Sequence, residues 1–404
     1  MFDYKKIRAE FPIFSHHPDL IYLDNAATTH KPNSVIESIS NFYEKENANI
    51  HRGIYPLAAQ TTLKYEEVRS KVAQFIHADS PNEIVYTSGT TTSINLVAHS
   101  FLRPRLEEGD EVIISAMEHH ANLIPWQMVC KNARANLRVI PMNESGELDL
   151  MKFKTMLSRK VKMVAIVHIS NSLGTINPIE EIIELSHQKD IPVLVDGAQS
   201  VAHYPINVAV LDVDFFTCSG HKLFGPTGVG ILYGKKSYLE QMEPYQFGGD
   251  MIKNVTFEET IFAEVPQRFE AGTTNIAGVI GLGAAIDFVN SLDRVAVVDY
   301  INDITNDLMS KLLEVNDLEI VGTAKNKSSI VSFSLKNIHP HDVATFLGTD
   351  NIAVRAGNHC TQPVMDFYKI PGTTRASFSI YNHTAEIDIL VEKIKEIQQF
   401  FSGV

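Results

Sequence analysis

The stretch IPVLVD, residues 191–196, carries no polar side chain until its last position, where an aspartate ends the run. A run of this kind is typical of a strand that is buried on both faces of a mostly parallel sheet. Segments with helical spacing, such as PIEEIIELSHQK (178–189), alternate with this and similar runs. We therefore predict an α/β fold whose main domain contains a mostly parallel seven-stranded sheet. The seven runs are EIVYTS (83–88), EVIIS (111–115), LRVI (137–140), KMVAIVHIS (162–170), IPVLVD, DFFTCS (214–219) and GVGILY (228–233).

The pattern changes after about residue 285. A long helix is predicted over residues 287–315, followed by further strands and a closing amphipathic helix. We therefore predict a large α/β domain over residues 20–285 and a smaller α+β domain over residues 286–404, which residues 1–19 join. Residues 245–275 are rich in glycine and polar side chains, which favours a projecting loop or hairpin. The later strands are predicted over 328–335, 352–357 and 375–382, and the closing helix over 386–403.

The composition of the 404 residues is ordinary for a globular enzyme, with 44% hydrophobic and 21% charged residues. A formal net charge of −13 argues against a nucleic-acid partner and against adhesion to an anionic membrane, because both need a basic surface. The three cysteines form no CxxC pair, which fits free thiols in a reducing compartment. No segment approaches the roughly 20 apolar residues of a membrane span, and the first residues do not resemble a signal peptide. We expect a cytoplasmic protein.

A lysine and an aspartate follow two of the predicted strands. Lys222 lies in SGHKLFGPTGVG (219–230), between a buried strand and a tight glycine–proline turn. Such a lysine can have a lowered pKa and act as a Schiff-base nucleophile, although an isolated loop lysine is more often simply solvated. Asp196 ends IPVLVD at the edge where cofactors bind. A carboxylate there could keep the pyridine nitrogen of pyridoxal phosphate protonated, or it could only cap the next helix.

Two other motifs also follow predicted strands. SGTTTSIN (88–95) opens a helix, and its free N–H groups and threonine hydroxyls suit a phosphate, although such runs are also common helix caps. MEHHAN (117–122) offers a histidine that could lie on a cofactor ring and move a proton. Adjacent histidines point in different directions, so we do not predict a metal site here.

RAGNHC (355–360) puts Cys360 on a turn rather than inside an apolar run. A thiol that must reach a bound substrate and then a partner protein needs such a position, and His359 could help to keep it as a thiolate. Taken alone, such a cysteine is more often an ordinary exposed thiol. Cys130 and Cys218 lie in apolar contexts, which predicts buried structural thiols.

The order and spacing of these motifs resemble the class V, fold-type I, pyridoxal phosphate enzymes, from YLDNAATTHKP (22–32) to RASFSIYN (375–382). More narrowly, the chain resembles the group II cysteine desulfurases of the SufS/CsdA type and their selenocysteine lyase relatives, because RxGxHC is diagnostic of that group. Asn351 stands where a glycine is common, and asparagine tolerates the same left-handed conformation. The resemblance implies bound pyridoxal 5'-phosphate, L-cysteine as substrate, a homodimer with shared active sites, and a sulfur-acceptor protein of an iron–sulfur assembly system as partner.

The resemblance also implies a role for individual residues. Lys222 is expected to carry the cofactor, Cys360 to take the sulfur, and His119 to stack on the ring and move a proton. Thr273 is expected to reach the phosphate in the neighbouring subunit. The other expected contacts are Asp196 with the pyridine nitrogen; Gln199 and Asn171 near the phenolic oxygen; Thr90, Thr91, Ser219 and His221 with the phosphate; and Arg375, Arg355, His51 and Arg52 around the substrate carboxylate.

The implied activity is that of a cysteine desulfurase, a sulfurtransferase that converts L-cysteine to L-alanine and leaves a persulfide on Cys360. Lys222 is the expected base for the α-proton. The sequence leaves two alternatives open. One is another enzyme on the same scaffold, such as a selenocysteine lyase, a cysteine sulfinate desulfinase or an aminotransferase. The other is a sulfur-relay protein without turnover.

Overall fold

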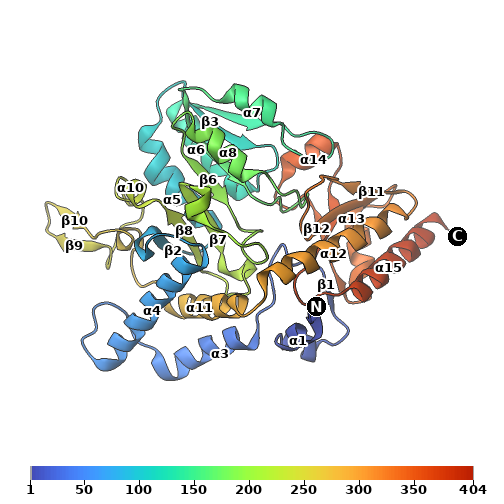
Figure 1. Cartoon of the computed structure of the whole chain (residues 1–404), viewed down its shortest axis with the longest axis horizontal. Helices are drawn as coiled ribbons and strands as arrows, with labels where there is room; N and C mark the ends of the chain where they lie inside the picture. Colours follow the sequence, from blue (N-terminus) through green and yellow to red (C-terminus); the bar gives the residue numbers. More distant parts are fainter. Residues whose placement is uncertain (1, 404) are drawn as a thin grey trace.

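The structure is a computed structural model that describes residues 2–403 (Figure 1). Its largest sheet has seven strands in the order β2-β8-β7-β6-β5-β3-β4. All neighbours pair in parallel except β8, which runs antiparallel to both β2 and β7. The predicted mostly parallel seven-stranded sheet is therefore confirmed. The strands are β2 (Ile84–Thr87), β3 (Glu111–Ser115), β4 (Asn136–Ile140), β5 (Val161–Val167), β6 (Val193–Asp196), β7 (Phe215–Ser219) and β8 (Gly230–Gly234).

Successive side chains of the central strands enter opposite faces of this sheet. In β6, Val193 and Val195 belong to one apolar cluster and Leu194 to the other, as the run without polar side chains predicts. Helices cover both faces (Figure 1), so the carboxyl ends of the parallel strands form an edge at which a ligand can bind. The helices on the first face include α4 (Pro56–Phe75), α7 (Leu150–Met156), α8 (Ile179–His187) and α11 (Ile276–Asn290), and those on the second include α5 (Thr90–Leu96) and α6 (Ile124–Ala133).

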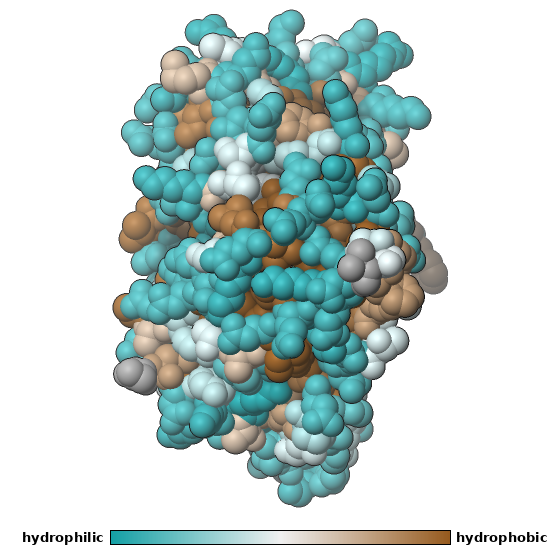
Figure 2. Space-filling model, turned by 90° about the vertical axis from the view of Figure 1, so that its right-hand side faces the viewer, coloured by the Kyte–Doolittle hydropathy of each residue, from teal (hydrophilic) through white to brown (hydrophobic). Residues whose placement is uncertain are grey.

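The C-terminal part contains a four-stranded antiparallel sheet in the order β11-β12-β15-β14. Its own apolar core lies between this sheet and three helices. The outer face is mainly hydrophilic, with separate apolar patches (Figure 2). Its elements are β11 (Leu318–Val321), β12 (Ile330–Leu335), β14 (Arg355–Gly357), β15 (Thr373–Ser377), α12 (Arg294–Leu313), α13 (Pro340–Thr349) and α15 (Thr384–Ser402).

The N-terminal segment packs on the C-terminal part. Arg8 of α1 (Tyr4–Ala9) forms an ion pair of 2.9 Å with Glu386 of α15. Strand β1 (Ile21–Tyr22) pairs in parallel with β13 (Ile352–Ala353). This pairing carries the residues that follow β1 across to the edge of the large sheet.

The predicted single helix over residues 287–315 is wrong. The structure has two helices there, α11 and α12, bent by 83° at the break between them. After the break, Asp293 caps the start of α12, and its carboxylate accepts from the N–H groups of Val295 and Ala296 at 3.1 Å. Within residues 2–403 no single helix is long and apolar enough to cross a membrane, and this bent pair meets that test only when its two helices are joined.

Two other predicted segments are refined. The strand expected over residues 352–357 is divided into β13 and β14, because the chain leaves β1 and turns to pair with β15. The strand expected over 375–382 is β15, which begins two residues earlier and ends at Ser377. Residues 245–275 contain the predicted hairpin, formed by β9 (Ile252–Val255) and β10 (Thr260–Phe262), and it projects from the body of the molecule (Figure 1).

Candidate active site

A cavity of about 420 Å³ lies at the carboxyl ends of β5, β6 and β7, where the α/β architecture predicts a ligand. All of the predicted site residues line this cavity except Thr273, His51 and Arg52. Residues from the N-terminal segment, the large sheet and the C-terminal part meet here. The predicted residues that line it are Thr90, Thr91, His119, Asn171, Asp196, Gln199, Ser219, His221, Lys222, Arg355, Cys360 and Arg375.

Lys222 and Asp196 both line the cavity, and the charge of Asp196 acts on the amine of Lys222. Lys222 ends the short 3₁₀ turn that follows β7, and Asp196 is the last residue of β6. Burial lowers the pKa of Lys222 to about 8, although Asp196 opposes that shift. Burial raises the pKa of Asp196 above its usual value. A lysine with this pKa has an appreciable fraction of neutral amine near neutral pH, as a Schiff-base nucleophile requires.

His119 is held with a defined tautomer. Its Nδ1 accepts a hydrogen bond from the Ala121 N–H at 3.0 Å. Burial, together with the charge of Lys222, lowers the pKa of His119 to about 4, so the ring is neutral at physiological pH. Because Nδ1 is the acceptor, the proton of the neutral ring is on Nε2. His119 can therefore donate a proton or hydrogen bond through Nε2.

Glu118, which the sequence analysis did not single out, fixes the turn that carries His119. Its carboxylate accepts from Ser115 Oγ (2.6 Å), the Val167 N–H (3.0 Å) and Asn122 Nδ2 (2.6 Å). These bonds tie the ends of β3 and β5 to the histidine turn. The signal was present in the sequence as the carboxylate that opens EHHAN, three residues after the end of a buried strand.

Two arginines meet at Asp24, another residue that the sequence analysis missed. The Asp24 carboxylate accepts from Arg375 Nη2 at 3.0 Å and from Arg355 Nη2 at 2.9 Å. Arg375 also donates from Nη1 to the Asn171 carbonyl at 2.9 Å, and its side chain is only 2% exposed. A rigid, buried guanidinium of this kind suits recognition of a substrate carboxylate.

Cys360 has an exposed side chain, whereas Cys130 and Cys218 are buried as predicted. The expected help from His359 is not supported by the geometry. The His359 ring is buried, its Nε2 is 2.8 Å from Thr373 Oγ1, and burial lowers its pKa to about 3. A neutral ring turned toward Thr373 supplies no positive charge to a thiolate. The basic groups whose charges act on the thiol are Lys222, Arg355 and Arg375.

Comparison with known proteins gives one consistent family. Residues 21–390 match the aminotransferase class-V family. A probable cysteine desulfurase of Halalkalibacterium halodurans is 45% identical over 402 residues, covering 99% of both chains. The crystal structure of the cysteine desulfurase CsdA of Escherichia coli superposes with a TM-score of 0.92 at 37% identity over 99% of both chains. A cysteine desulfurase of Thermococcus onnurineus has a TM-score of 0.93 at 36% identity over 97% of both chains.

This chain belongs to the class-V aminotransferases and, within them, to the cysteine desulfurases. The fold-type I architecture expected from the sequence is thereby confirmed.

The cofactor of this desulfurase family is pyridoxal 5'-phosphate, and the cavity residues fit it. The Asp196 carboxylate has a single hydrogen bond within residues 2–403, from the Ala198 N–H to Oδ1 at 2.9 Å, so its other oxygen is available to a ring nitrogen. Asn171 Oδ1 and Arg375 Nε are buried without a hydrogen-bond partner among the described residues, which leaves both available to a ligand.

The N-terminus of α5 lines the part of the cavity that suits the phosphate group of the cofactor. Ser219 Oγ lies 2.9 Å from both the amide nitrogen and Oγ1 of Thr90, and Thr91 also lines the cavity. His221 is beside them, with Nδ1 at 3.2 Å from Thr28 Oγ1. Hydroxyls, an imidazole and helix N–H groups together suit a phosphate dianion.

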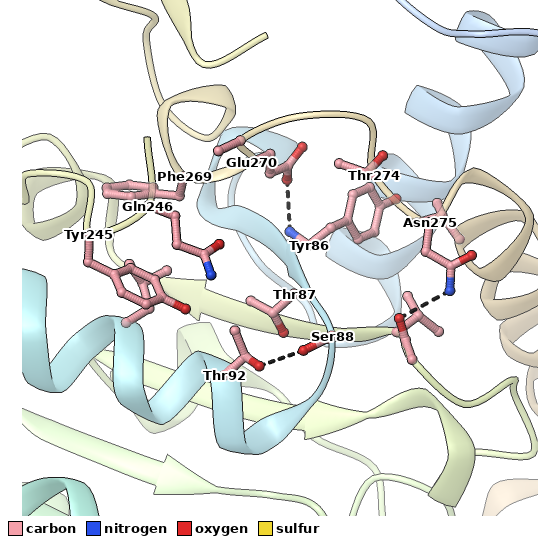
Figure 3. A pocket seen from close by; sticks show the side chains of 15 residues that line it. Tyr86, Thr87, Ser88, Thr92, Tyr245, Gln246, Phe269, Glu270, Thr274 and Asn275 are labelled. Carbon is pink, nitrogen blue, oxygen red and sulfur yellow. Dashed lines mark hydrogen bonds between the residues drawn. The ribbon is translucent and has the colours of Figure 1, made fainter. Parts of the chain in front are cut away.

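The structure does not bring His51, Arg52 or Thr273 to this cavity of the same chain. His51 and Arg52 are exposed because they precede α4, where His51 Nε2 lies 3.0 Å from Glu66 and Arg52 pairs with Asp250 at 3.0 Å. Thr273 is exposed, and its neighbour Thr274 lines a second cavity of about 330 Å³ (Figure 3). The two cavities flank the start of α5, since Thr90 and Thr91 line the first and Thr92 lines the second.

Side chains in the second cavity hold the segment that carries Thr273. Glu270 accepts from the Tyr86 N–H at 2.8 Å, as drawn in Figure 3. Asn275 Nδ2 donates to the Gly228 carbonyl at 3.1 Å, and Thr274 Oγ1 donates to Tyr65 Oη at 2.9 Å. The segment is therefore anchored on both sides of Thr273, which itself remains exposed.

Proposed function

We propose that this desulfurase converts L-cysteine to L-alanine and holds the released sulfur as a persulfide on Cys360. The observation that carries the proposal is an exposed thiol, Cys360, that lines the same cavity as Lys222 and Asp196. A loop thiol of this kind can meet both a bound substrate and an external acceptor. The specific roles given below for the cavity residues are part of this proposal.

Each residue around the cavity has a separate role in the proposed reaction. Arg375 binds the substrate carboxylate, and Asp24 fixes its guanidinium beside that of Arg355. When bound, pyridoxal phosphate supplies an electron sink for the α-carbon of the amino acid, and Asp196 keeps its ring nitrogen charged. The Lys222 amine carries the cofactor and moves the α-proton, which its lowered pKa favours. His119 holds a proton on Nε2 for the departing group or the product.

Sulfur transfer is a displacement at the sulfur of the substrate. The Cys360 thiolate attacks this sulfur, a sulfur–sulfur bond forms, and the Cβ–S bond of cysteine breaks. The electron pair of the broken bond stays with the carbon product, which gains a proton and leaves as alanine. The sum is cysteine plus the Cys360 thiol giving alanine plus the Cys360 persulfide, so atoms and electrons balance without an external oxidant.

The exposure of Cys360 also supports transfer of the sulfur to a second protein, for which we propose an acceptor of an iron–sulfur assembly system. Three free thiols support a reducing, cytoplasmic setting.

We further propose that two copies pair and that Thr273, His51 and Arg52 complete the cavity of the partner copy. These residues are exposed and held in place by their own chain. Large apolar side chains are also exposed nearby on α3 (Asn33–Asn41) and α4 and in the segment between them, which is unusual for a free surface. They are Ile36, Tyr43, Ile54, Tyr55, Leu57 and Leu63. Sedimentation should give twice the mass of one chain.

The function is tested by giving the holoenzyme L-cysteine with a reductant and measuring alanine and sulfide for the parent and for Cys360→Ala. Alanine from the parent alone supports the proposal. Alanine from both proteins at equal rates would remove the sulfur-accepting role from Cys360 and favour a broader lyase. Pyruvate or another keto acid in place of alanine would contradict desulfuration.

A further inference from the structure

The loop that carries Cys360 is joined by three hydrogen bonds, among residues 2–403, to the segments that follow strands β3 and β5 of the large sheet. The Asn171 side chain donates from Nδ2 to the His359 carbonyl at 2.6 Å. The other two bonds belong to one residue, His120. Its N–H donates to the Cys360 carbonyl at 2.8 Å, and its Nε2 accepts from the Gln362 N–H at 3.2 Å. The two His120 bonds therefore lie at the thiol residue and two positions beyond it.

The backbone of this loop is strained. His359 and Cys360 have φ angles of 52° and 58°, so two successive residues with side chains lie in the left-handed region. This conformation is unfavourable for residues other than glycine, and it persists only where surrounding contacts impose it. Bonds within the loop also help, since Asn358 Oδ1 accepts from the Cys360 N–H at 3.1 Å. The bonds from His120 fix the loop relative to the cavity.

His120 itself does not line the cavity, whereas its neighbour His119 does. The dipeptide thus presents one imidazole to the cavity and turns the other to the loop. The short helix after the loop, α14 (Gln362–Tyr368), begins at the residue whose N–H reaches His120. Its residues Val364 and Met365 belong to a buried apolar cluster that also contains Met117 and Val167, and this cluster anchors the helix. The strained turn before the helix is held by the hydrogen bonds described above.

We propose that His120 is a positioning residue that holds the Cys360 thiol at the cavity for attack on the substrate sulfur. Loss of the bond between His120 Nε2 and the Gln362 N–H releases the strained turn and lets the thiol move outward, as delivery to an acceptor requires. This proposal rests on the proposed function, because it assigns two positions of the loop to two halves of the reaction.

The test compares three variants of the holoenzyme. His120→Ala removes the acceptor, and His120→Gln offers an amide oxygen in its place. His341→Ala is the matched control, because His341 is an exposed imidazole whose Nε2 lies near Gly357 and whose side chain makes no hydrogen bond to residues 355–362. The measurements are the visible absorbance of the bound cofactor, alanine formed in a single turnover, and the rate at which iodoacetamide alkylates Cys360.

For His120→Ala we expect alanine formation to slow and alkylation of Cys360 to accelerate, each by roughly 2- to 10-fold, the range for one hydrogen bond. The cofactor absorbance should not change, His120→Gln should recover much of both rates, and His341→Ala should match the parent. Unchanged rates in His120→Ala would overturn the proposal, as would equal changes in His341→Ala. Loss of cofactor absorbance in His120→Ala would assign His120 to the fold of the histidine turn and would also overturn it.

The alkylation measurement separates this proposal from the proposed function. If the parent formed no alanine, the desulfurase reaction would fail, but faster alkylation in His120→Ala alone would still support the loop contact.

Discussion

Glu270 is the buried carboxylate that fixes the segment bearing Thr273, and its removal gives a sharp test of how that segment is held. It accepts from Arg69 at 2.6 and 2.9 Å and from the Tyr86 N–H at 2.8 Å. The side chains of Arg69 and Glu270 are 2% and 3% exposed. The substitution Glu270→Leu leaves the guanidinium of Arg69 in the core without this partner.

The expected cost follows from that burial. Breaking a buried ion pair by removing one partner costs about 3–5 kcal/mol, because an uncompensated charge remains. Arg69 keeps Glu66 at 2.8 Å and the Ile84 carbonyl at 2.9 Å, which places the expected loss near the lower end, about 3 kcal/mol. Removing both charges in Arg69→Met/Glu270→Leu should cost less than the sum of the two single substitutions, with a coupling of about 0.5–3 kcal/mol.

The assay is urea unfolding followed by the fluorescence of Trp126, the single tryptophan, which is fully buried in α6. The matched control is the exposed pair of Arg134 and Glu108, whose side chains are 78% and 70% exposed. Glu108→Ala should change the free energy of unfolding by no more than about 1 kcal/mol. A loss below about 1 kcal/mol for Glu270→Leu, or a double variant that equals the sum of its singles, would refute this reasoning.

Two further predictions concern the cavity. Because the pKa of Lys222 in the folded, cofactor-free protein is about 8 rather than its usual 10.5, the folded state binds fewer protons than the unfolded state between these values. The free energy of unfolding of the cofactor-free protein should therefore rise with pH across this window relative to Lys222→Met, and parallel pH profiles in denaturant titrations would contradict it. Arg375→Lys should raise KM for L-cysteine by roughly 10-fold or more, since an ammonium cannot reproduce the fork that binds Asp24 and a carboxylate; steady-state kinetics with an unchanged KM would exclude Arg375 from carboxylate binding.

Much of the large sheet could be predicted because its determinants are local. The apolar run before Asp196 requires burial on both faces, and each chemical motif follows such a run at the same edge of the sheet. The left-handed conformation expected for Asn351 is confirmed, with φ at 58°. The same logic explains why Lys222, Asp196 and His119, which are separated in sequence, line one cavity.

The features that the sequence analysis missed depend on long-range contacts. Asp24 reaches Arg375 because β1 pairs with β13 and because Asp24 bridges to Ser377 of β15; these short contacts have no local signal. His120 and His359 are adjacent to predicted site residues, but their hydrogen-bond partners decide which way each ring turns. His51 and Thr273 lie in motifs that the family resemblance assigns to the site. Both are exposed in a single chain because of the positions of α4 and of the segment that Glu270 fixes.

The central claim is that Cys360 takes the sulfur of cysteine, and the most direct measurement is the mass of the peptide that contains it. The holoenzyme would be mixed with L-cysteine without reductant, trapped with an alkylating reagent and digested. We expect the Cys360 peptide to gain the mass of one additional sulfur atom, while the peptides of Cys130 and Cys218 do not, because both thiols are buried. Alanine formed without added sulfur on Cys360, or sulfur found on another cysteine, would contradict it.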